Sequence, residues 1–204
     1  MTIEIFYFEQ RSPEWYAVKL GLPSTSRFHC ILARGEGLMR RAYLYQLAAE
    51  IITGTPTESF KSTAMRRGIT MEPEARAHYA LMSNTEPQLV GFIRNGNMGA
   101  SPDSLIGEDG MLEIKTQEPD LLIETLFRKN EFPPEHKAQC QGNLLVAERD
   151  WIDISIYWPA MPTFIKRAYR EPGYLTLLQG EIDRFNDELA ALVAKLRAYG
   201  GRRP

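Results

Sequence analysis

The chain has 204 residues, of which 44% are hydrophobic, and its nine Phe, nine Tyr and three Trp can build a substantial core, which excludes a disordered chain. No run approaches the ~18–20 apolar residues of a membrane span, and the N-terminal segment lacks the pattern of a signal peptide. The net charge of −2 excludes a uniformly basic nucleic-acid binder. We expect a soluble, cytoplasmic protein with one domain over residues 1–204.

The first third of the chain has the pattern of a helical region. Ser12 and Pro13 have the positions of a cap and a first helical residue, and they begin a predicted helix that ends near Gly21. A kink or new start is expected at Pro73. Three further helices are predicted over 26–33, 38–52 and 62–82.

The hydrophobic pattern changes after residue 86. Hairpin signals at 95–97 and 108–110 separate short runs that predict an antiparallel meander over 88–94, 98–101, 104–107 and 111–115. Helices are predicted over 118–128 and 133–148, and strands over 151–158 and 162–169. A final amphipathic helix is predicted from residue 172 onward. This order predicts an α/β domain with a central mixed β-sheet.

Acidic residues are concentrated in the middle of the chain. Residues 71–120 contain nine Asp or Glu against three Lys or Arg, which is typical of a solvated acidic surface or of a cation-binding site. Cys30 and Cys140 are too few for a disulfide framework or a four-cysteine metal site, so we expect both to be reduced and buried.

The segment SPDSLIGEDGMLEIK, residues 101–115, carries the most informative charges. Glu113 and Lys115 share one face of a strand, because alternate side chains point the same way. A three-residue loop at 108–110 would bring Asp103 to that face, opposite Lys115, whereas a two-residue loop would put it on the other face. The three-residue loop is the favoured form.

Asp103, Glu113 and the main-chain carbonyl of Ile114 would form an all-oxygen site that suits Mg²⁺ or Mn²⁺. A lysine beside them can orient water and stabilise charge on a phosphate, as phosphodiester hydrolysis requires. From spacing alone, a surface hairpin with cross-strand ion pairs is an equally good interpretation.

The order P-D, hairpin, E-x-K resembles the core of the PD-(D/E)xK nucleases. Further blocks resemble the lambda exonuclease and YqaJ-type viral recombinase family in the same order: RSPEWYAVKLGLPSTSRFHCILA, RRGITMEPEARAHYALMSN and HKAQCQGNLLVAERDWIDISIYWP. The resemblance implies a restriction-endonuclease-like core, with a central mixed sheet flanked by helices. It also implies a Mg²⁺-dependent exonuclease, in which Mn²⁺ can substitute. Such an enzyme degrades one strand of linear double-stranded DNA from 5′ to 3′ and leaves 3′ overhangs for recombination by single-strand annealing.

The resemblance further implies a homotrimeric ring around DNA, a single-strand annealing protein as partner, no membrane, and a phage or prophage protein in a bacterial host. Asp103, Glu113 and the Ile114 carbonyl are implied as metal ligands, and Lys115 as the residue that positions the attacking water.

Two more catalytic residues are implied by the family pattern. Glu72 is similar to a helical glutamate that completes the metal centre, although its position also suits an ordinary first-turn helix acid. Gln139 matches the first glutamine of an A-Q-x-Q element and would line the active site, although an exposed polar residue would look the same. Gln141 lies on a different side of that helix.

Lys19, Ser26 and Ser101 are similar to the family's pocket for the 5′ phosphate of a DNA end. Lys19 stands where an arginine is expected, which keeps the charge but loses bidentate geometry. From its position alone, Ser26 would be interpreted as a helix N-cap. Three arginines that also fit solvated surface charge are candidates for contact with the DNA backbone: Arg34, Arg66 and Arg67.

Two alternative functions remain open. Another PD-(D/E)xK nuclease would cut closed circles or, if similar to Cas4, would need a four-cysteine iron–sulfur site that two cysteines cannot supply. A DNA-end-binding recombination module would bind without cleavage, but the intact set of acidic residues and lysine disfavours it.

Overall fold

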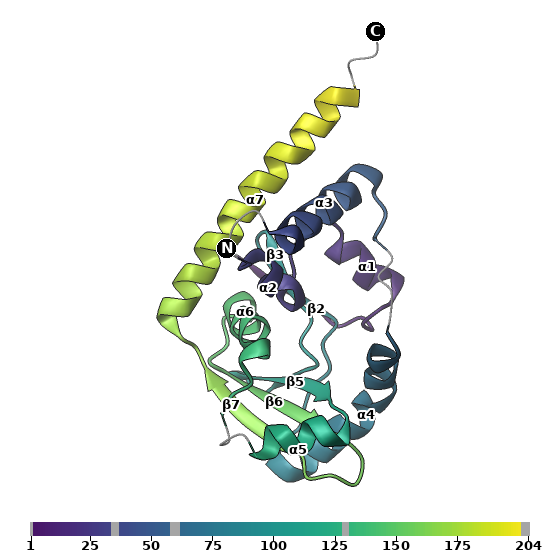
Figure 1. Cartoon of the computed structure of the whole chain (residues 1–204), viewed down its shortest axis with the longest axis vertical. Helices are drawn as coiled ribbons and strands as arrows, with labels where there is room; N and C mark the ends of the chain where they lie inside the picture. Colours follow the sequence, from purple (N-terminus) through teal and green to yellow (C-terminus); the bar gives the residue numbers. More distant parts are fainter. Residues whose placement is uncertain (1, 34–36, 58–61, 128–130, 201–204) are drawn as a thin grey trace.

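The described residues fold as two β-sheets flanked by helices (Figure 1). The first sheet is antiparallel, in the order β1 (Ile3–Phe6), β2 (Phe92–Asn95), β3 (Met98–Ala100). The prediction that the first third is helical missed β1, because four residues of alternating pattern are too few to distinguish from a loop. The computed structural model describes residues 2–33, 37–57, 62–127 and 131–200.

The second sheet is mixed, in the order β4 (Ser104–Ile106), β5 (Gly110–Thr116), β6 (Trp151–Tyr157), β7 (Phe164–Tyr169). Strands β5 and β6 are parallel, and the helical segment between them makes the crossover that a parallel pair requires. The predicted α/β class with a mixed sheet is confirmed.

The predicted continuous meander is wrong. The β2–β3 and β4–β5 hairpins lie in different sheets, and the chain passes between them at residues 101–103. Pro102 is at this crossing, where its missing N–H removes a donor that a continuous ladder would use.

Three helical segments follow β1. Helix α1 (Pro13–Lys19) begins as predicted, with the Ser12 hydroxyl accepting a hydrogen bond from the Trp15 amide. The helix predicted over 26–33 is instead a 3₁₀ turn, Thr25–Arg27, followed by the short helix α2 (Phe28–Ile31). Helix α3 (Leu38–Thr53) ends at Gly54, which has the left-handed conformation of a helix C-terminus.

The next helices along the chain pack against the mixed sheet. Helix α4 (Thr63–Ser83) continues through Pro73 and packs Ala75 and Tyr79 against β5 and β6. Helix α5 (Pro119–Phe127) and helix α6 (Lys137–Ala147), which follows a 3₁₀ turn at Pro134–His136, lie between β5 and β6 in sequence.

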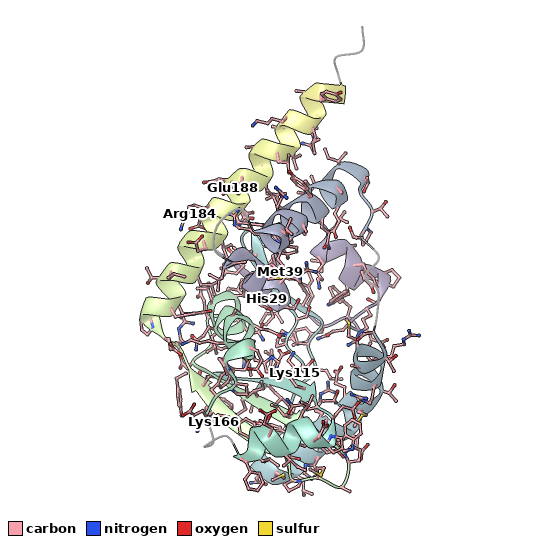
Figure 2. All side chains as sticks on the ribbon, in the orientation of Figure 1. His29, Met39, Lys115, Lys166, Arg184 and Glu188 are labelled. Carbon is pink, nitrogen blue, oxygen red and sulfur yellow. The ribbon has the colours of Figure 1, made fainter. Side chains whose placement is uncertain are left out.

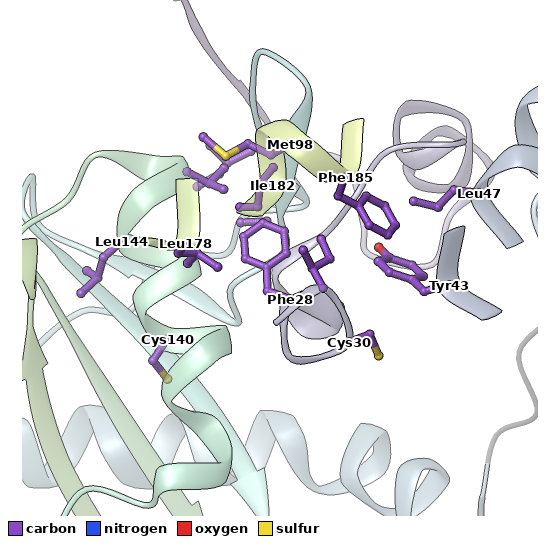
Figure 3. Packing of buried hydrophobic residues seen from close by; sticks show 14 of the residues in the cluster. Phe28, Cys30, Tyr43, Leu47, Met98, Cys140, Leu144, Leu178, Ile182 and Phe185 are labelled. Carbon is purple, nitrogen blue, oxygen red and sulfur yellow. The ribbon is translucent and has the colours of Figure 1, made fainter. Parts of the chain in front are cut away.

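The main core joins α6 to the N-terminal helices and to α7 (Pro172–Gly200), as Figure 3 shows. Phe185 of α7 stacks on Tyr43 of α3, with ring centroids 5.5 Å apart. Cys30 and Cys140 are free thiols buried in this core, as predicted. The far end of α7 projects beyond the body, and Tyr199 near this end is exposed.

Gly142 allows α6 to approach the N-terminal helices, since a Cβ at this position would lie 2.6 Å from the buried ring of Phe28. We expect Gly142→Ala to lower the free energy of unfolding by about 1–3 kcal/mol, because the ring must move in a packed core. Chemical denaturation measures the change. The matched control is Gly180→Ala on α7, where a Cβ meets nothing within 4 Å. It should stabilise by about 0.5–1 kcal/mol, and a stabilising Gly142→Ala would contradict the packing argument.

Candidate active site

The β4–β5 hairpin brings the charged residues together, with a loop that differs from the predicted one. Ile106 pairs with Gly110, so the loop consists of residues 107–109. Continuing this register brings Asp103 beside Glu113, not opposite Lys115 as predicted. The loop keeps the expected odd length, and all three charged residues line one pocket.

Gly110 is the reason for the different register. The ring of Trp151 lies 2.1 Å from the position of a Cβ on Gly110, so this glycine is required in the strand, and Gly107 takes the left-handed conformation at φ +53°. Arg149 donates to the carbonyls of Gly107 and Gly110 at 2.9 and 2.7 Å. The turn after α6 therefore holds both ends of the loop.

Glu113, Lys115 and Gln139 form a closed set of hydrogen bonds between β5 and α6, with Lys115 near the centre of the body (Figure 2). Oε1 of the buried Glu113 accepts from Lys115 Nζ at 2.7 Å and from Gln139 Nε2 at 2.5 Å. Gln139 Oε1 accepts from Lys115 at 3.0 Å. Burial alone would lower the pKa of Lys115, but the charges of Glu113 and Asp103 outweigh it and raise that pKa. The lysine therefore carries a positive charge at neutral and alkaline pH.

Asp103 lies at the entrance to β4, beside two other acids. Its Oδ2 accepts a hydrogen bond from the Ile114 amide at 2.5 Å. Burial raises the pKa of Asp103 well above its ordinary value, and the negative charges of Glu113 and of Glu72 on α4 raise it further. The acids repel one another here, which favours binding of a proton or a cation.

Arg76 holds Glu72 in place and was missed by the sequence interpretation. Its Nη2 donates to Glu72 Oε1 at 2.5 Å and to the Asp103 carbonyl at 3.3 Å, and its Nε donates to Ser104 Oγ at 2.9 Å. Arg76 therefore ties α4 to β4. The spacing i, i+4 from Glu72 on a predicted helix was the available signal.

Asn143, one turn after Gln139 on α6, was also missed. Its Nδ2 donates to Oε2 of Glu113 at 3.1 Å, and the same i, i+4 spacing could have indicated it. Gln141 instead donates to the Tyr169 carbonyl at 2.8 Å, away from the acids. The expectation that Gln141 lies on another side of the helix is confirmed.

A pocket of about 670 Å³ joins the acids to a basic region near α1. Lys19 and Ser26 line it together with Glu72, Asp103, Glu113 and Lys115. Ser101 is connected to this region through Trp15, whose indole donates to Ser101 Oγ at 2.9 Å. The ammonium of Lys19 lies 3.9 Å from the centre of the same indole.

Lys19 has a perturbed charge state. Burial lowers the pKa of Lys19 to about 8, against the opposing effect of Glu50, and the positive charges of Arg11 and Arg27 lower it further. Arg11 and Arg27 also line the pocket and were not singled out from the sequence. An anion in this region would stabilise the charged form of Lys19.

The three arginines expected at the DNA backbone have different surroundings. Arg34 lies outside the described residues, and Arg66 on α4 is exposed. Arg67 forms an ion pair with Glu118 and lies over the ring of Trp158 at 4.7 Å from its centre. Arg67 is therefore engaged within the protein.

The acids fit a hard divalent cation that keeps several waters. Among the described residues, no group of three or more His, Cys, Asp or Glu side chains is arranged to hold a metal ion. Asp103 and Glu113 both line the pocket, and carboxylate oxygens are donors that suit Mg²⁺ better than zinc. Burial and the charges of Glu113 and Glu72 together raise the pKa of Asp103, and a bound cation would relieve the repulsion among these acids.

The fold and the site together define a class. A mixed sheet flanked by helices, with Pro-Asp at one strand and Glu-x-Lys on the next, is a PD-(D/E)xK-type fold. Within that class, the chain belongs to the YqaJ-like viral recombinase family, whose domain model matches residues 14–150. The resemblance stated from the sequence blocks is confirmed.

Solved structures that are similar to this chain agree with the family assignment. The chain is 30% identical to LHK-Exo in complex with dAMP, over 94% of this chain and 99% of that one, with a TM-score of 0.86. It is 29% identical, over the same shares, to an alkaline exonuclease (LHK-Exo) from Laribacter hongkongensis, with a TM-score of 0.85. A phage related exonuclease from Haemophilus somnus 129PT, at 10% identity, has the same fold, with a TM-score of 0.66 over 86% of this chain and 96% of that one.

No curated protein matches the chain significantly. Within the described ranges, no helix has the length and apolar character needed to cross a membrane.

Proposed function

We propose that this protein is a Mg²⁺-dependent exonuclease that degrades one strand of linear double-stranded DNA from 5′ to 3′ and leaves 3′ overhangs. The family and the exonuclease neighbours support a phage-type exonuclease. The observation that carries the finer proposal is the single pocket that contains Lys19 and Ser26 together with the acids and Lys115. A terminal phosphate bound at one end of this pocket would bring the next phosphodiester toward the acids.

In this mechanism, Asp103, Glu113 and the Ile114 carbonyl would hold the cation, and Glu72 would complete the catalytic centre without joining these ligands. A divalent cation, when bound, supplies Lewis-acid stabilisation of the charge that develops on the phosphate under attack. Mn²⁺ can substitute for Mg²⁺, since both accept an all-oxygen site.

Lys115 supplies the positive charge on the protein's side. Its ammonium is fixed by Glu113 and Gln139 at 2.7 and 3.0 Å, so it can orient the attacking water and stabilise negative charge without reorganisation. Gln139 contacts both Glu113 and Lys115 and would thereby fix both groups in the active site. The reaction class is hydrolysis of a phosphodiester bond.

The 5′ phosphate would bind to Lys19, Ser26 and Ser101. A charged ammonium and hydroxyl groups are suitable donors for a phosphate, and the pKa of Lys19 near 8 would rise when the anion binds. Of the two candidate arginines that the structure describes, Arg66 and Arg67, Arg66 is exposed and would contact the DNA backbone.

We further infer a single domain over residues 1–204 that works as a homotrimeric ring, in the cytoplasm of a bacterial host, as a phage or prophage protein. Its partner would be a single-strand annealing protein that takes up the exposed 3′ strand. These inferences rest on the family. A DNA channel is compatible with the net charge of −2 if basic groups line it.

The proposal is tested with linear duplexes that carry or lack a 5′ phosphate, and with a closed circle, each with Mg²⁺ or with EDTA. Labels on the 5′ and 3′ ends report the direction. We expect Mg²⁺-dependent loss of one strand from its 5′ end, faster with the phosphate, and an intact circle. Cleavage of the circle would indicate an endonuclease instead. Binding of ends without loss of either strand would indicate a non-cleaving recombination module.

A further inference from the structure

The side chain of Asn143 has no place in the proposed chemistry, yet it contacts a central acid of the site. It is completely buried on α6, and its Nδ2 donates to Oε2 of Glu113 at 3.1 Å. Gln139, one turn earlier on the same helix, donates to Oε1 at 2.5 Å. The two amides therefore contact different oxygens of one carboxylate.

The two oxygens of Glu113 are not equally occupied. Oε1 accepts from both Lys115 and Gln139, which uses both of its lone-pair directions. Oε2 accepts from Asn143, and the described part of the chain supplies no second donor to it. Oε2 therefore keeps a free lone pair and has its orientation fixed by Asn143.

Asp103 has a similar arrangement. Its Oδ2 accepts from the Ile114 amide, and no donor to Oδ1 is found in the described ranges. Asp103 is thus oriented through Oδ2 and keeps Oδ1 for a ligand, whereas Glu113 is oriented through both oxygens and keeps one lone pair of Oε2 for a ligand.

Only one end of the Asn143 amide has a hydrogen-bond partner among the described residues. Its Oδ1 is buried and has no hydrogen-bond partner among the residues that the structure describes. An ionised carboxylate only accepts hydrogen bonds, so the amide must turn its nitrogen toward Glu113 and leave its oxygen unpaired. Leucine, of similar size, would remove this unpaired oxygen, but it would also remove the donor to Oε2 of the buried Glu113. The useful property of asparagine here is its donor to Glu113.

We propose that Asn143 is a positioning residue that fixes Oε2 of Glu113 for a divalent cation. The inference rests on the proposed function for the identity of the cation, but it concerns binding of the cation and not cleavage of DNA. Removal of groups that orient a metal ligand weakens metal binding by about 10–100-fold.

The test is calorimetric titration of the DNA-free protein with Mn²⁺, together with thermal melting in EDTA. We expect Asn143→Leu to bind Mn²⁺ about 10–100-fold more weakly than the unmodified protein does, and its melting temperature in EDTA reports any separate loss of stability. Asn143→Ala, which removes the donor without adding bulk, should show the same loss of affinity and covers the case in which leucine does not fit.

The matched control is Gln141→Leu. Gln141 is also a buried amide on α6, but it contacts the Tyr169 carbonyl and the Glu171 amide and not the acids. We expect this variant to melt at a lower temperature and to bind Mn²⁺ with unchanged affinity. A merely structural role for Asn143 would give the same pattern in Asn143→Leu and would overturn the inference.

Two further results would also overturn it: unchanged Mn²⁺ affinity in both Asn143 variants, or the absence of Mn²⁺ binding by the unmodified protein. The outcome is separate from that of the cleavage assay. A protein that binds Mn²⁺ through this arrangement but leaves linear DNA intact would refute the proposed function alone.

Discussion

Lys115→Ala is expected to lower kcat for release of nucleotides from linear DNA by about 10²–10⁴-fold. The lysine supplies a fixed positive charge, because its ammonium lies 2.7 Å from Glu113 and 3.0 Å from Gln139 and its pKa is raised. A charge that is already oriented stabilises the developing negative charge without reorganisation, which a water molecule in its place cannot do. Single-turnover cleavage at saturating Mg²⁺ measures the change.

A surface lysine provides the control for Lys115. Lys195 is exposed on α7 and is not among the residues that line the pocket, so Lys195→Ala removes the same charge from the chain without changing the pocket lining. We expect its kcat to match that of the unmodified protein. If Lys115→Ala retains kcat within about tenfold, which is far less than the loss of a fixed charge should cause, the assigned role of this lysine is wrong.

Asp103→Asn is expected to raise the melting temperature of the metal-free protein at pH 8 while it removes cleavage. Burial and the charges of Glu113 and Glu72 raise the pKa of Asp103, so the folded state keeps its proton at a pH at which the unfolded state has lost it. The stability from this group is complete below the unfolded pKa of about 3.9 and is lost as the pH rises through the folded pKa. Asparagine is neutral and avoids the loss.

The difference in melting temperature between Asp103→Asn and the unmodified protein follows from the same linkage between pKa and stability. Each unit of pKa difference corresponds to about 1.4 kcal/mol, and each kcal/mol corresponds to about 2–4 °C in a chain of this length. Thermal melts in EDTA from pH 5 to pH 9 should therefore show a difference between Asp103→Asn and the unmodified protein that grows with pH. Addition of Mg²⁺ should reduce the difference, because a bound cation stabilises the ionised acids.

Asp109→Asn is the control for this experiment, since Asp109 is exposed in the β4–β5 loop. It should show no gain in melting temperature that grows with pH. A lower melting temperature for Asp103→Asn at pH 8, or a difference that does not vary with pH, would show that repulsion among the acids does not destabilise the folded protein.

The helices could be predicted well because their signals are local. The Ser12 cap, the amphipathic period of α7 and the proline start near residue 134 each depend on a few neighbouring residues. Strand β1 could not, since its four residues are defined by pairing with β2, which lies far along the chain. The assignment of the two hairpins to different sheets also depends on contacts that no local pattern contains.

The site was predictable in part for the same reason. Asp103, Glu113 and Lys115 belong to one hairpin, so strand alternation alone indicated that they lie together. The exact partner of Asp103 depended on Trp151 covering Gly110, a contact between distant residues. Arg76 and Asn143 are located by α4 and α6, whose orientation toward the sheet is a tertiary property.

The hydrogen bonds from Arg149 to the two ends of the β4–β5 loop affect the order in which the protein folds. The hairpin itself is local, but its loop is fixed by an arginine 42 and 39 positions further along the chain. Such contacts form only after the entropy of closing a long loop has been lost, so they come late relative to local turns. A chain in which β6 has not yet joined β5 therefore lacks the constraint that keeps Asp103 beside Glu113. The ability to bind a cation should thus arise together with the complete fold, and partly folded chains should lack it.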